Sequence, residues 1–259
     1  MIRTLSPEAL IDDIRDLARR AGEVILNIYR TDFEIRRKDD ASPVTEADEA
    51  AERVILPALR SLTPGVPVIA EEEVAAGRIE SLSGDYFWLV DPLDGTKEFI
   101  AGNDEFTVNI ALIHTIRPVL GVVYAPALDA MYAGTGPGTA DLETPGAARR
   151  AIVVRAVPEG GAVMISSRSH GDPNSLTELT ESLHVAHHRI TGSSLKFCLV
   201  AEGEADIYPR YGPTSEWDTA AGDAVLRAAG GSVRTLDGAD LFYGKDKFRN
   251  PRFIARGLD

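Results

Sequence analysis

The feature that most constrains the fold is an apolar run that ends in two closely spaced aspartates. Residues 86–90 read Tyr-Phe-Trp-Leu-Val, a run of strand length, and Asp91-Pro-Leu-Asp94-Gly-Thr96 follows at once. Proline and glycine favour a turn, and a turn after a strand can bring two carboxylates and a backbone carbonyl to one point. The segment therefore predicts a strand that ends in a cation site. For this segment taken alone, an aspartate-rich surface turn stays the alternative.

Further acidic residues stand where a folded chain can hold them in place. Glu71 and Glu72 follow the strand-like run 66–70, while Asp48 and Asp218 each stand at the start of a helical pattern. Taken singly, each is more simply a carboxylate near a helix N-terminus or a solvated charge. Together with the two aspartates of the turn, they favour a metal site. Because no histidine or cysteine accompanies them, the oxygen ligands favour Mg²⁺ or Mn²⁺ over zinc.

The spacing of the turn motif argues against several other cation and phosphate sites. An EF-hand loop needs acidic ligands at alternate positions and glycine at the sixth, whereas here the second aspartate is fourth and the glycine fifth. Phosphatases that form an aspartyl phosphate carry Asp-x-Asp, but two residues separate Asp91 from Asp94, so a nucleophilic aspartate is disfavoured. The sequence contains no P-loop, no dinucleotide-binding glycine pattern and no Gly-x-Ser-x-Gly elbow.

The composition limits the partners of this chain. A formal net charge of −13 disfavours binding to nucleic-acid polymers, although bound cations can let a carboxylate cluster accept a small anionic ester. The single cysteine, Cys198, lies in an apolar run and is expected to be a buried thiol. No run reaches the length of a membrane span and no signal-peptide core is present, so we expect a cytoplasmic protein. Loose association with the inner membrane and assembly into a homodimer are left open by the sequence.

The order of apolar patterns predicts two lobes. A helix over about 7–28, with Ser6 as N-cap, leads to a second helix from Glu46 that Pro57 is expected to kink or end. Strands are expected at 66–70, 86–90, 106–113, 118–124 and 126–133. Beyond the glycine-rich stretch 134–146, strands at 151–157 and 162–166 alternate with helices at 174–183, 193–202 and 217–229. We therefore expect an N-terminal α+β lobe at 1–135 with most metal ligands, and a C-terminal α/β lobe at 136–259 that carries Asp218 and part of the substrate pocket.

Four segments together resemble the inositol monophosphatase superfamily of lithium-sensitive, magnesium-dependent phosphatases. They are Trp88-Leu-Val-Asp-Pro-Leu-Asp-Gly-Thr96, Glu216-Trp-Asp-Thr-Ala-Ala-Gly222, Ile69-Ala-Glu-Glu72 and Val44-Thr-Glu-Ala-Asp48. The match covers nearly the whole chain in the expected order. The resemblance implies an α/β (α+β) fold, the layered αβαβα sandwich of the inositol monophosphatase and sugar phosphatase type, with the site between the lobes.

Two shorter segments narrow the resemblance. Lys97-Glu98-Phe99 and Gly192-Ser-Ser-Leu-Lys196 look like the CysQ-type 3′(2′),5′-bisphosphate nucleotidases. The implied reaction is Mg²⁺-dependent hydrolysis of adenosine 3′,5′-bisphosphate to AMP and phosphate, with 3′-phosphoadenylyl sulfate as a further candidate substrate. An inositol monophosphatase or a sugar-bisphosphate phosphatase of the same superfamily is the first alternative. A non-catalytic protein that binds a phosphorylated ligand is the remote one.

The resemblance also implies the roles of individual residues. Two or three Mg²⁺ ions, for which Mn²⁺ can substitute, are expected on Glu71, Asp91, the Leu93 carbonyl, Asp94 and Asp218. Thr96 and Asp48 are expected to form a hydrogen-bonded pair that orients the attacking water, with Glu71 close by and no phosphoenzyme. The predicted substrate-binding residues are Glu71, Leu93, Asp94, Gly95, Thr96, Lys97, Ser193 and Asp218.

For several other candidate site residues, a structural role is considered as well as a functional one. Lys97 is read as a contact to a second phosphate or to metal-bound water, and equally as a solvated surface lysine. Arg168 and His170 are candidates for the ribose or the second phosphate. Backbone N–H groups at Gly192 and Ser193 are expected either to face an anion or simply to begin a helix. Trp88 and Trp217 are expected to pack in the core beside the site.

Overall fold

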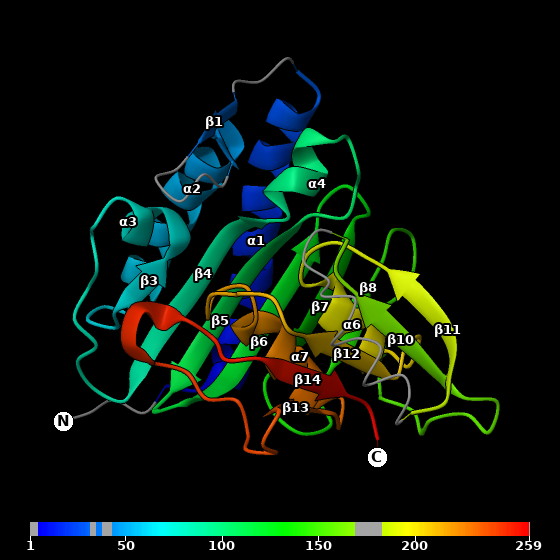
Figure 1. Cartoon of the computed structure of the whole chain (residues 1–259). Helices are drawn as coiled ribbons and strands as arrows, with labels where there is room; N and C mark the ends of the chain where they lie inside the picture. The colour runs from blue at the N-terminus through cyan, green and yellow to red at the C-terminus, as the bar shows by residue number, and fades with distance from the viewer. Residues whose placement is uncertain (1–4, 32–34, 38–42, 169–182, 259) are drawn as a thin grey trace.

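The computed structural model describes residues 5–31, 35–37, 43–168 and 183–258 as stacked layers of helices and sheets (Figure 1). Helices α1 (Pro7–Tyr29) and α2 (Glu46–Leu62) cover one face of a seven-stranded sheet. Helices α6 (Leu195–Ala201) and α7 (Ala220–Ala228) lie between its other face and a five-stranded sheet. No helix in the described ranges is both long and apolar enough to cross a bilayer.

The seven-stranded sheet has the order β3-β4-β5-β6-β7-β8-β9. Its strands are β3 (Val68–Ala70), β4 (Tyr86–Asp94), β5 (Thr107–His114), β6 (Arg117–Ala125), β7 (Ala130–Gly134), β8 (Asp141–Glu143) and β9 (Arg150–Ala151). The pair β3 and β4 is parallel, and the remaining strands form an antiparallel meander. Because parallel strands end at the same edge of a sheet, the residues that follow β3 lie beside the end of β4.

The five-stranded sheet is mixed, with the order β11-β10-β12-β14-β13. Its strands are β10 (Ala162–Ser166), β11 (Val185–Ile190), β12 (Ile207–Arg210), β13 (Ser232–Thr235) and β14 (Phe253–Arg256). The remaining elements are the hairpin of β1 (Ile35–Arg37) and β2 (Pro43–Thr45), the short helices α3 (Glu71–Ala75) and α4 (Thr96–Ile100), and the 3₁₀ turn η1 (Asp246–Phe248).

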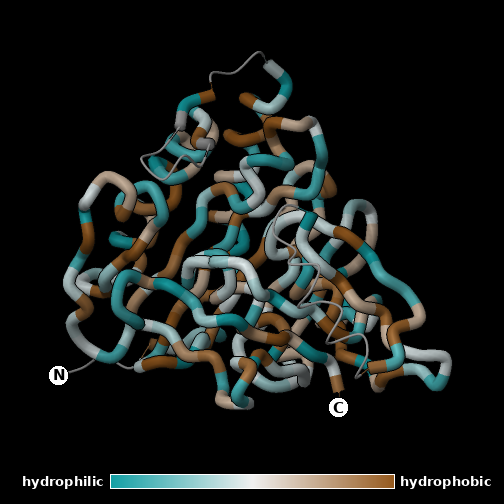
Figure 2. Tube along the Cα trace, viewed as in Figure 1, coloured by the Kyte–Doolittle hydropathy of each residue, from teal (hydrophilic) through white to brown (hydrophobic). Residues whose placement is uncertain are grey.

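The large sheet is buried on both faces, which explains why its strands read as continuous apolar runs rather than alternating ones. Along β4, Trp88 and Val90 pack with α1 and α2, whereas Phe87 and Leu89 pack with α6, α7 and the second sheet. Figure 2 shows the corresponding hydrophobic stretches of chain inside the molecule and the hydrophilic ones toward its margin. Two apolar clusters on opposite faces therefore pack against β4, which continues past the predicted turn and carries Asp91 and Asp94 at its end.

Close backbone packing brings α7 onto this sheet. A side chain at Gly121 of β6 would put its Cβ 2.4 Å from the carbonyl oxygen of Ala221, and one at Gly222 would lie 2.6 Å from the Phe197 ring. Glycine is the residue that permits such approaches. The start of α7, and with it the segment that carries Asp218, is thus held against β6 and α6.

The structure confirms some of the expected elements and corrects others. The first helix begins at Pro7 as predicted, although the Ser6 side chain makes no capping hydrogen bond. Of the two outcomes expected at Pro57, a kink or an end of the helix, the end is excluded: Ile55 and Leu59 are buried on both sides of the proline, and α2 continues to Leu62. The helix predicted at 174–183 falls almost entirely on residues outside the described ranges.

The predicted strand at 151–157 is also wrong beyond its first residue. Only Arg150 and Ala151 pair as β9, and the following N–H groups of Ile152 and Val154 donate to the Ala140 and Ala229 carbonyls instead. The alternating apolar residues there contact a loop and the end of α7 rather than a strand. The seven-stranded sheet continues to Ala151 through β8 and β9, and the division into lobes at residue 135 stays a prediction.

Candidate active site

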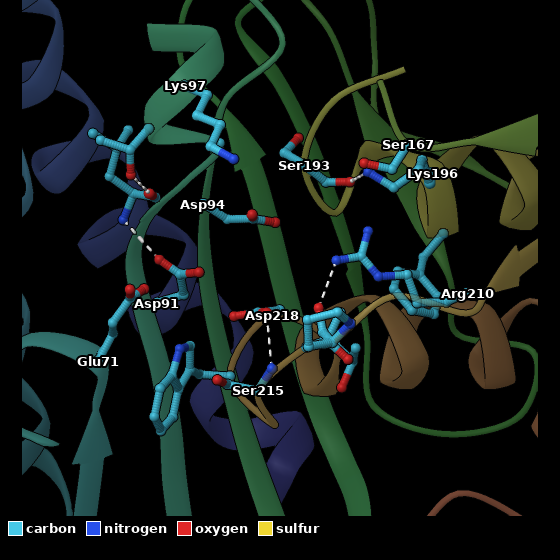
Figure 3. Close-up of a pocket in the computed structure, with 18 of the residues that line it drawn as sticks. Glu71, Asp91, Asp94, Lys97, Ser167, Ser193, Lys196, Arg210, Ser215 and Asp218 are labelled. Atoms are coloured by element: carbon cyan, nitrogen blue, oxygen red, sulfur yellow. Dashed lines mark hydrogen bonds between the residues drawn. The ribbon is translucent and has the colours of Figure 1, made fainter. Parts of the chain in front are cut away.

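A cavity of about 550 Å³ opens where the end of β4 faces the start of α7 and the end of β12. Its lining combines acidic and basic side chains, and Figure 3 shows Asp91, Asp94, Asp218, Lys196 and Arg210 around the same space. The acidic residues are Glu71, Asp91, Asp94 and Asp218, and the basic ones are Lys97, Lys196, Arg210, Lys247 and Arg249. One cavity thus offers oxygen ligands for a cation and positive charge for an anion.

Three of the carboxylates meet at one point. One oxygen each from Glu71, Asp91 and Asp218 lie within 4.8 Å of one another. Glu71 begins α3 directly after β3, and the parallel register of β3 with β4 brings it beside Asp91. Asp218 comes from the segment before α7 and is held by the Ser215 N–H, which donates to its Oδ2 at 2.9 Å. The structure therefore brings together three of the predicted metal ligands.

A bulge at the end of β4 directs Asp94 to the same cavity. Asp91 pairs with Asn109 and Asp94 with Thr107, so three steps on β4 match two on β5. In a regular strand, side chains three positions apart point to opposite faces, and the extra residue removes this difference. The Leu93 N–H donates to Asp91 Oδ1 at 3.1 Å, while the Leu93 side chain is buried in the core.

Two polar residues that the sequence reasoning missed hold Asp94. Its Oδ2 accepts from Ser194 Oγ at 2.9 Å and from Asn109 Nδ2 at 3.3 Å, and Ser194 Oγ also lies 2.8 Å from the Asp218 carbonyl oxygen. Since the hydroxyl has one proton, it donates to one of these oxygens at a time. A buried amide inside the apolar run 107–114 was the available signal for Asn109.

The predicted pair of Asp48 and Thr96 is present. Thr96 Oγ1 lies 3.2 Å from Asp48 Oδ1 and 3.3 Å from the Leu93 carbonyl oxygen. The other carboxylate oxygen of Asp48 accepts from the N–H and the hydroxyl of Thr45, at 2.8 and 2.7 Å, which completes a capping box at the start of α2. Asp48 therefore fills both roles considered from the sequence, that of a helix-capping carboxylate and that of a partner for Thr96.

The carboxylate cluster has excess negative charge. Burial raises the pKa of Asp218, and the charges of Asp94 and Glu71 raise it further. Buried carboxylates that repel one another are stabilised by a cation between them, and an all-oxygen donor set suits Mg²⁺ rather than a softer metal. The residues present thus fit the hard divalent cation that the sequence predicts.

Basic side chains form the opposite wall of the cavity. Lys196 is 4% exposed, its ammonium donates to the carbonyls of Thr191 and Ser193, and burial lowers its pKa to about 8. Arg210 is 7% exposed and donates to the carbonyls of Gly212 and Pro213 at 3.2 and 2.8 Å. Figure 3 shows both residues across the cavity from Glu71 and Asp91.

The model of the inositol monophosphatase family matches residues 7–256 of this chain. The chain belongs to this family. It is 50% identical over 250 residues to the 3′(2′),5′-bisphosphate nucleotidase CysQ of Salmonella typhimurium, covering 94% of this chain and 98% of that protein. The protein of the same name from Escherichia coli K12 is 48% identical, with the same coverage.

Solved structures of the family have the same layered fold. CysQ from Bacteroides thetaiotaomicron superposes with a TM-score of 0.78 at 37% identity, covering 94% of this chain and 95% of that one. An inositol monophosphatase from Anabaena superposes with a TM-score of 0.74 at 28% identity, covering 96% and 90%. The predicted fold class, the layered α/β sandwich of the inositol monophosphatase family, is confirmed.

The remaining site predictions have mixed outcomes in this family member. Gly95, Lys97 and Ser193 line the cavity as expected, with Gly95 at a φ of 91°. Of the two readings of the Gly192 segment, a contact to a substrate anion is not favoured, because the Gly192 N–H donates to Glu105 Oε2 of the chain itself at 2.9 Å. Arg168 pairs with the same carboxylate at 3.0 Å and lies outside the lining, and His170 lies outside the described residues.

The structural readings of the tryptophans and the cysteine hold. Trp88 is fully buried, and its ring N–H donates to Thr63 Oγ1 at 2.9 Å. Trp217 is buried as predicted, and it also lines the cavity. Cys198 is buried, and burial raises the pKa of its thiol, as expected for a structural cysteine.

Proposed function

We propose that this chain is a 3′(2′),5′-bisphosphate nucleotidase that hydrolyses the 3′-phosphate of adenosine 3′,5′-bisphosphate to AMP and phosphate. The observation that carries the proposal is the cavity in which a carboxylate cluster faces basic side chains, among them Lys196 and Arg210. Such a site can hold cations and a substrate with more than one anionic group. The identity to CysQ nucleotidases over nearly the whole chain supports the choice of substrate within the family.

The proposed cofactor is Mg²⁺, as two or three ions, with Mn²⁺ as a substitute. Glu71, Asp91, Asp94, Asp218 and the Leu93 carbonyl would hold these ions. When bound, they supply neutralisation of the phosphate charge and a lowered pKa of water.

The chain's own residues then position the reactants. Asp48 accepts a hydrogen bond from the Thr96 hydroxyl, which leaves the Thr96 oxygen free to accept a hydrogen bond from the attacking water and to orient it. The Gly95 and Thr96 amides and the Ser193 region are proposed to contact phosphate oxygens, and Lys97 is proposed to approach from α4. Water attacks the phosphorus directly, and no aspartyl phosphate forms.

Phosphate release from a substrate panel tests this proposal. We expect the purified protein to release phosphate from adenosine 3′,5′-bisphosphate in Mg²⁺ and to stop when EDTA is added. Efficient hydrolysis of inositol 1-phosphate with adenosine 3′,5′-bisphosphate left intact would refute the nucleotide substrate and favour the other phosphatases of the family. No release from any compound of the panel would favour a binding protein. A cytoplasmic location, loose membrane association and homodimerisation stay predictions.

A further inference from the structure

We propose that Asn250 is a positioning residue of the proposed metal site. Its side-chain amide holds the segment of residues 214–219 in the position from which Asp218 meets Glu71 and Asp91. The inference rests on the metal site of the proposed function and deepens it, because it names a residue that acts on a metal ligand without contacting the metal. Asn250 does not line the cavity, and no sequence motif suggested a functional residue in its part of the chain.

The carboxylate of Asp218 depends on a neighbouring residue of its own segment. The Ser215 N–H donates to Asp218 Oδ2 at 2.9 Å, as Figure 3 shows. Asp218 itself lies in a turn before α7, so neither a strand nor a helix fixes its backbone. The direction of this carboxylate is therefore set by the contacts that other segments make with the turn.

The Asn250 amide joins the two sides of this turn. Its Nδ2 donates to the Ser215 carbonyl oxygen at 2.7 Å and to Thr219 Oγ1 at 2.9 Å, and these residues stand before and after Asp218. A longer contact of 3.3 Å reaches Thr214 Oγ1, and the Asn250 backbone N–H donates to the Thr214 carbonyl oxygen at 3.0 Å. Because the amide nitrogen carries two N–H groups, the two shorter contacts use both of them.

The same contacts fix the orientation of the amide. The Ser215 carbonyl oxygen can only accept a hydrogen bond, so the NH₂ group and not the oxygen of Asn250 faces it. The Thr219 hydroxyl donates to the Glu216 carbonyl oxygen at 3.1 Å and thus offers Asn250 a lone pair. Among the described residues, Asn250 Oδ1 is buried without a hydrogen-bond partner. Since an unpaired buried acceptor costs stability, the donors of the amide are the part that stabilises this arrangement.

The two residues before Asn250 hold only one side of the turn. Arg249 Nη1 and the Phe248 carbonyl oxygen form hydrogen bonds with residues 215 and 216, both of which precede Asp218. Within 248–250, and counting contacts among the described residues, Asn250 alone also bonds to a residue after Asp218. Without its amide this segment would anchor the turn on one side, and Asp218 would be held less firmly in the carboxylate cluster.

Mg²⁺ binding tests this role. We would measure the dissociation constant of Mg²⁺ by calorimetry and the rise in unfolding temperature that Mg²⁺ produces, for the wild type and for Asn250→Ala. The dissociation constant is expected to increase about tenfold, and the rise in unfolding temperature should shrink accordingly. The Mg²⁺ concentration for half-maximal phosphate release should increase by the same factor, while kcat at saturating Mg²⁺ should change far less.

Thr219 provides a second test that stands even if Asn250→Ala does not fold. Thr219→Val removes the hydroxyl that Asn250 binds and should weaken Mg²⁺ binding as well, whereas Thr219→Ser keeps the hydroxyl and should restore the binding. Asn27→Ala is the matched control, because Asn27 is an exposed asparagine of α1, and its dissociation constant should be that of the wild type.

A purely structural role of Asn250 predicts a different result. The unfolding temperature of Asn250→Ala would then fall equally in EDTA and in Mg²⁺, with an unchanged dissociation constant, and the proposal would be refuted. It would also be refuted if the control weakened Mg²⁺ binding equally, or if the wild type bound no Mg²⁺. A wild type that binds Mg²⁺ but leaves adenosine 3′,5′-bisphosphate intact would refute the proposed substrate instead, and the Mg²⁺ measurements would still decide the role of Asn250.

Discussion

Removing one charge from the carboxylate cluster should stabilise the metal-free protein, and the same change should abolish its activity. The change is Asp218→Asn, which preserves shape, and the amide oxygen can still accept the Ser215 N–H that now binds Asp218 at 2.9 Å. Oxygens of Asp218, Glu71 and Asp91 lie within 4.8 Å of one another. At that distance and an effective dielectric constant of about 20, two unit charges repel by roughly 3 kcal/mol.

Part of this repulsion is relieved when the cluster binds a proton, as the raised pKa of Asp218 indicates. We therefore expect the variant to gain about 2 kcal/mol in EDTA, which for a chain of this size is a rise of roughly 4–8 °C in unfolding temperature. In Mg²⁺ the wild type should instead unfold at the higher temperature, because a bound cation stabilises the intact carboxylate cluster more than the cluster that has lost one charge. The value of kcat/KM should fall by on the order of 10³.

Thermal unfolding gives the unfolding temperatures in EDTA and in Mg²⁺, and phosphate release gives kcat/KM. Asp13→Asn is the matched control, because it removes an exposed aspartate of α1 and should change none of them by a comparable amount. A variant that unfolds below the wild type in EDTA would refute the reasoning, because Asp218 would then be a stabilising residue rather than a repelled ligand. So would an active variant.

Three further predictions concern single contacts. Thr96→Val should lower kcat about 10²-fold with a smaller effect on KM, since it removes the hydroxyl that Asp48 orients, whereas Thr96→Ser should retain most of the activity. Ser194→Ala removes a donor to Asp94 and should raise the Mg²⁺ concentration for half-maximal activity about tenfold in a metal titration. Burial raises the pKa of Glu52 to about 7, so the folded protein binds a proton that the unfolded chain releases between about pH 4.5 and 7. Stability should fall as the pH rises through that range, by up to about 3 kcal/mol. Glu52→Gln should flatten this dependence in urea titrations, and an unchanged slope would contradict the role of Glu52.

The parts of the site that are local in sequence could be predicted, and the parts that depend on distant contacts could not. Asp91 and Asp94 lie at the end of β4, and Asp48 lies in the first turn of α2, so short-range patterns were sufficient to single them out. Asn109 reaches Asp94 only through the register of β5 with β4. Arg249 reaches Ser215 through a contact between segments that no periodicity connects.

The errors also have physical causes. The stretch 151–157 alternates apolar and polar residues as a strand does, but its N–H groups find partners on a loop and a helix end. Gly192 has the sequence context of an anion-binding turn, yet Glu105, which is remote in sequence, takes its N–H. Each pattern was compatible with two sets of hydrogen-bond partners, and tertiary packing chose between them.

The contact between Glu216 and residues 244–245 has a consequence for when the site can close during protein synthesis. A ribosome completes the carboxylates of the cluster before it makes the segment whose N–H groups Glu216 accepts. Until that segment has been made, Glu216 lacks both the backbone N–H donors and the Lys245 ammonium, although its carboxylate is fully buried in the finished protein. We therefore expect the nascent chain to carry every proposed metal ligand before the segment that holds Glu216 is available, and closure of the site to be one of the last steps of folding.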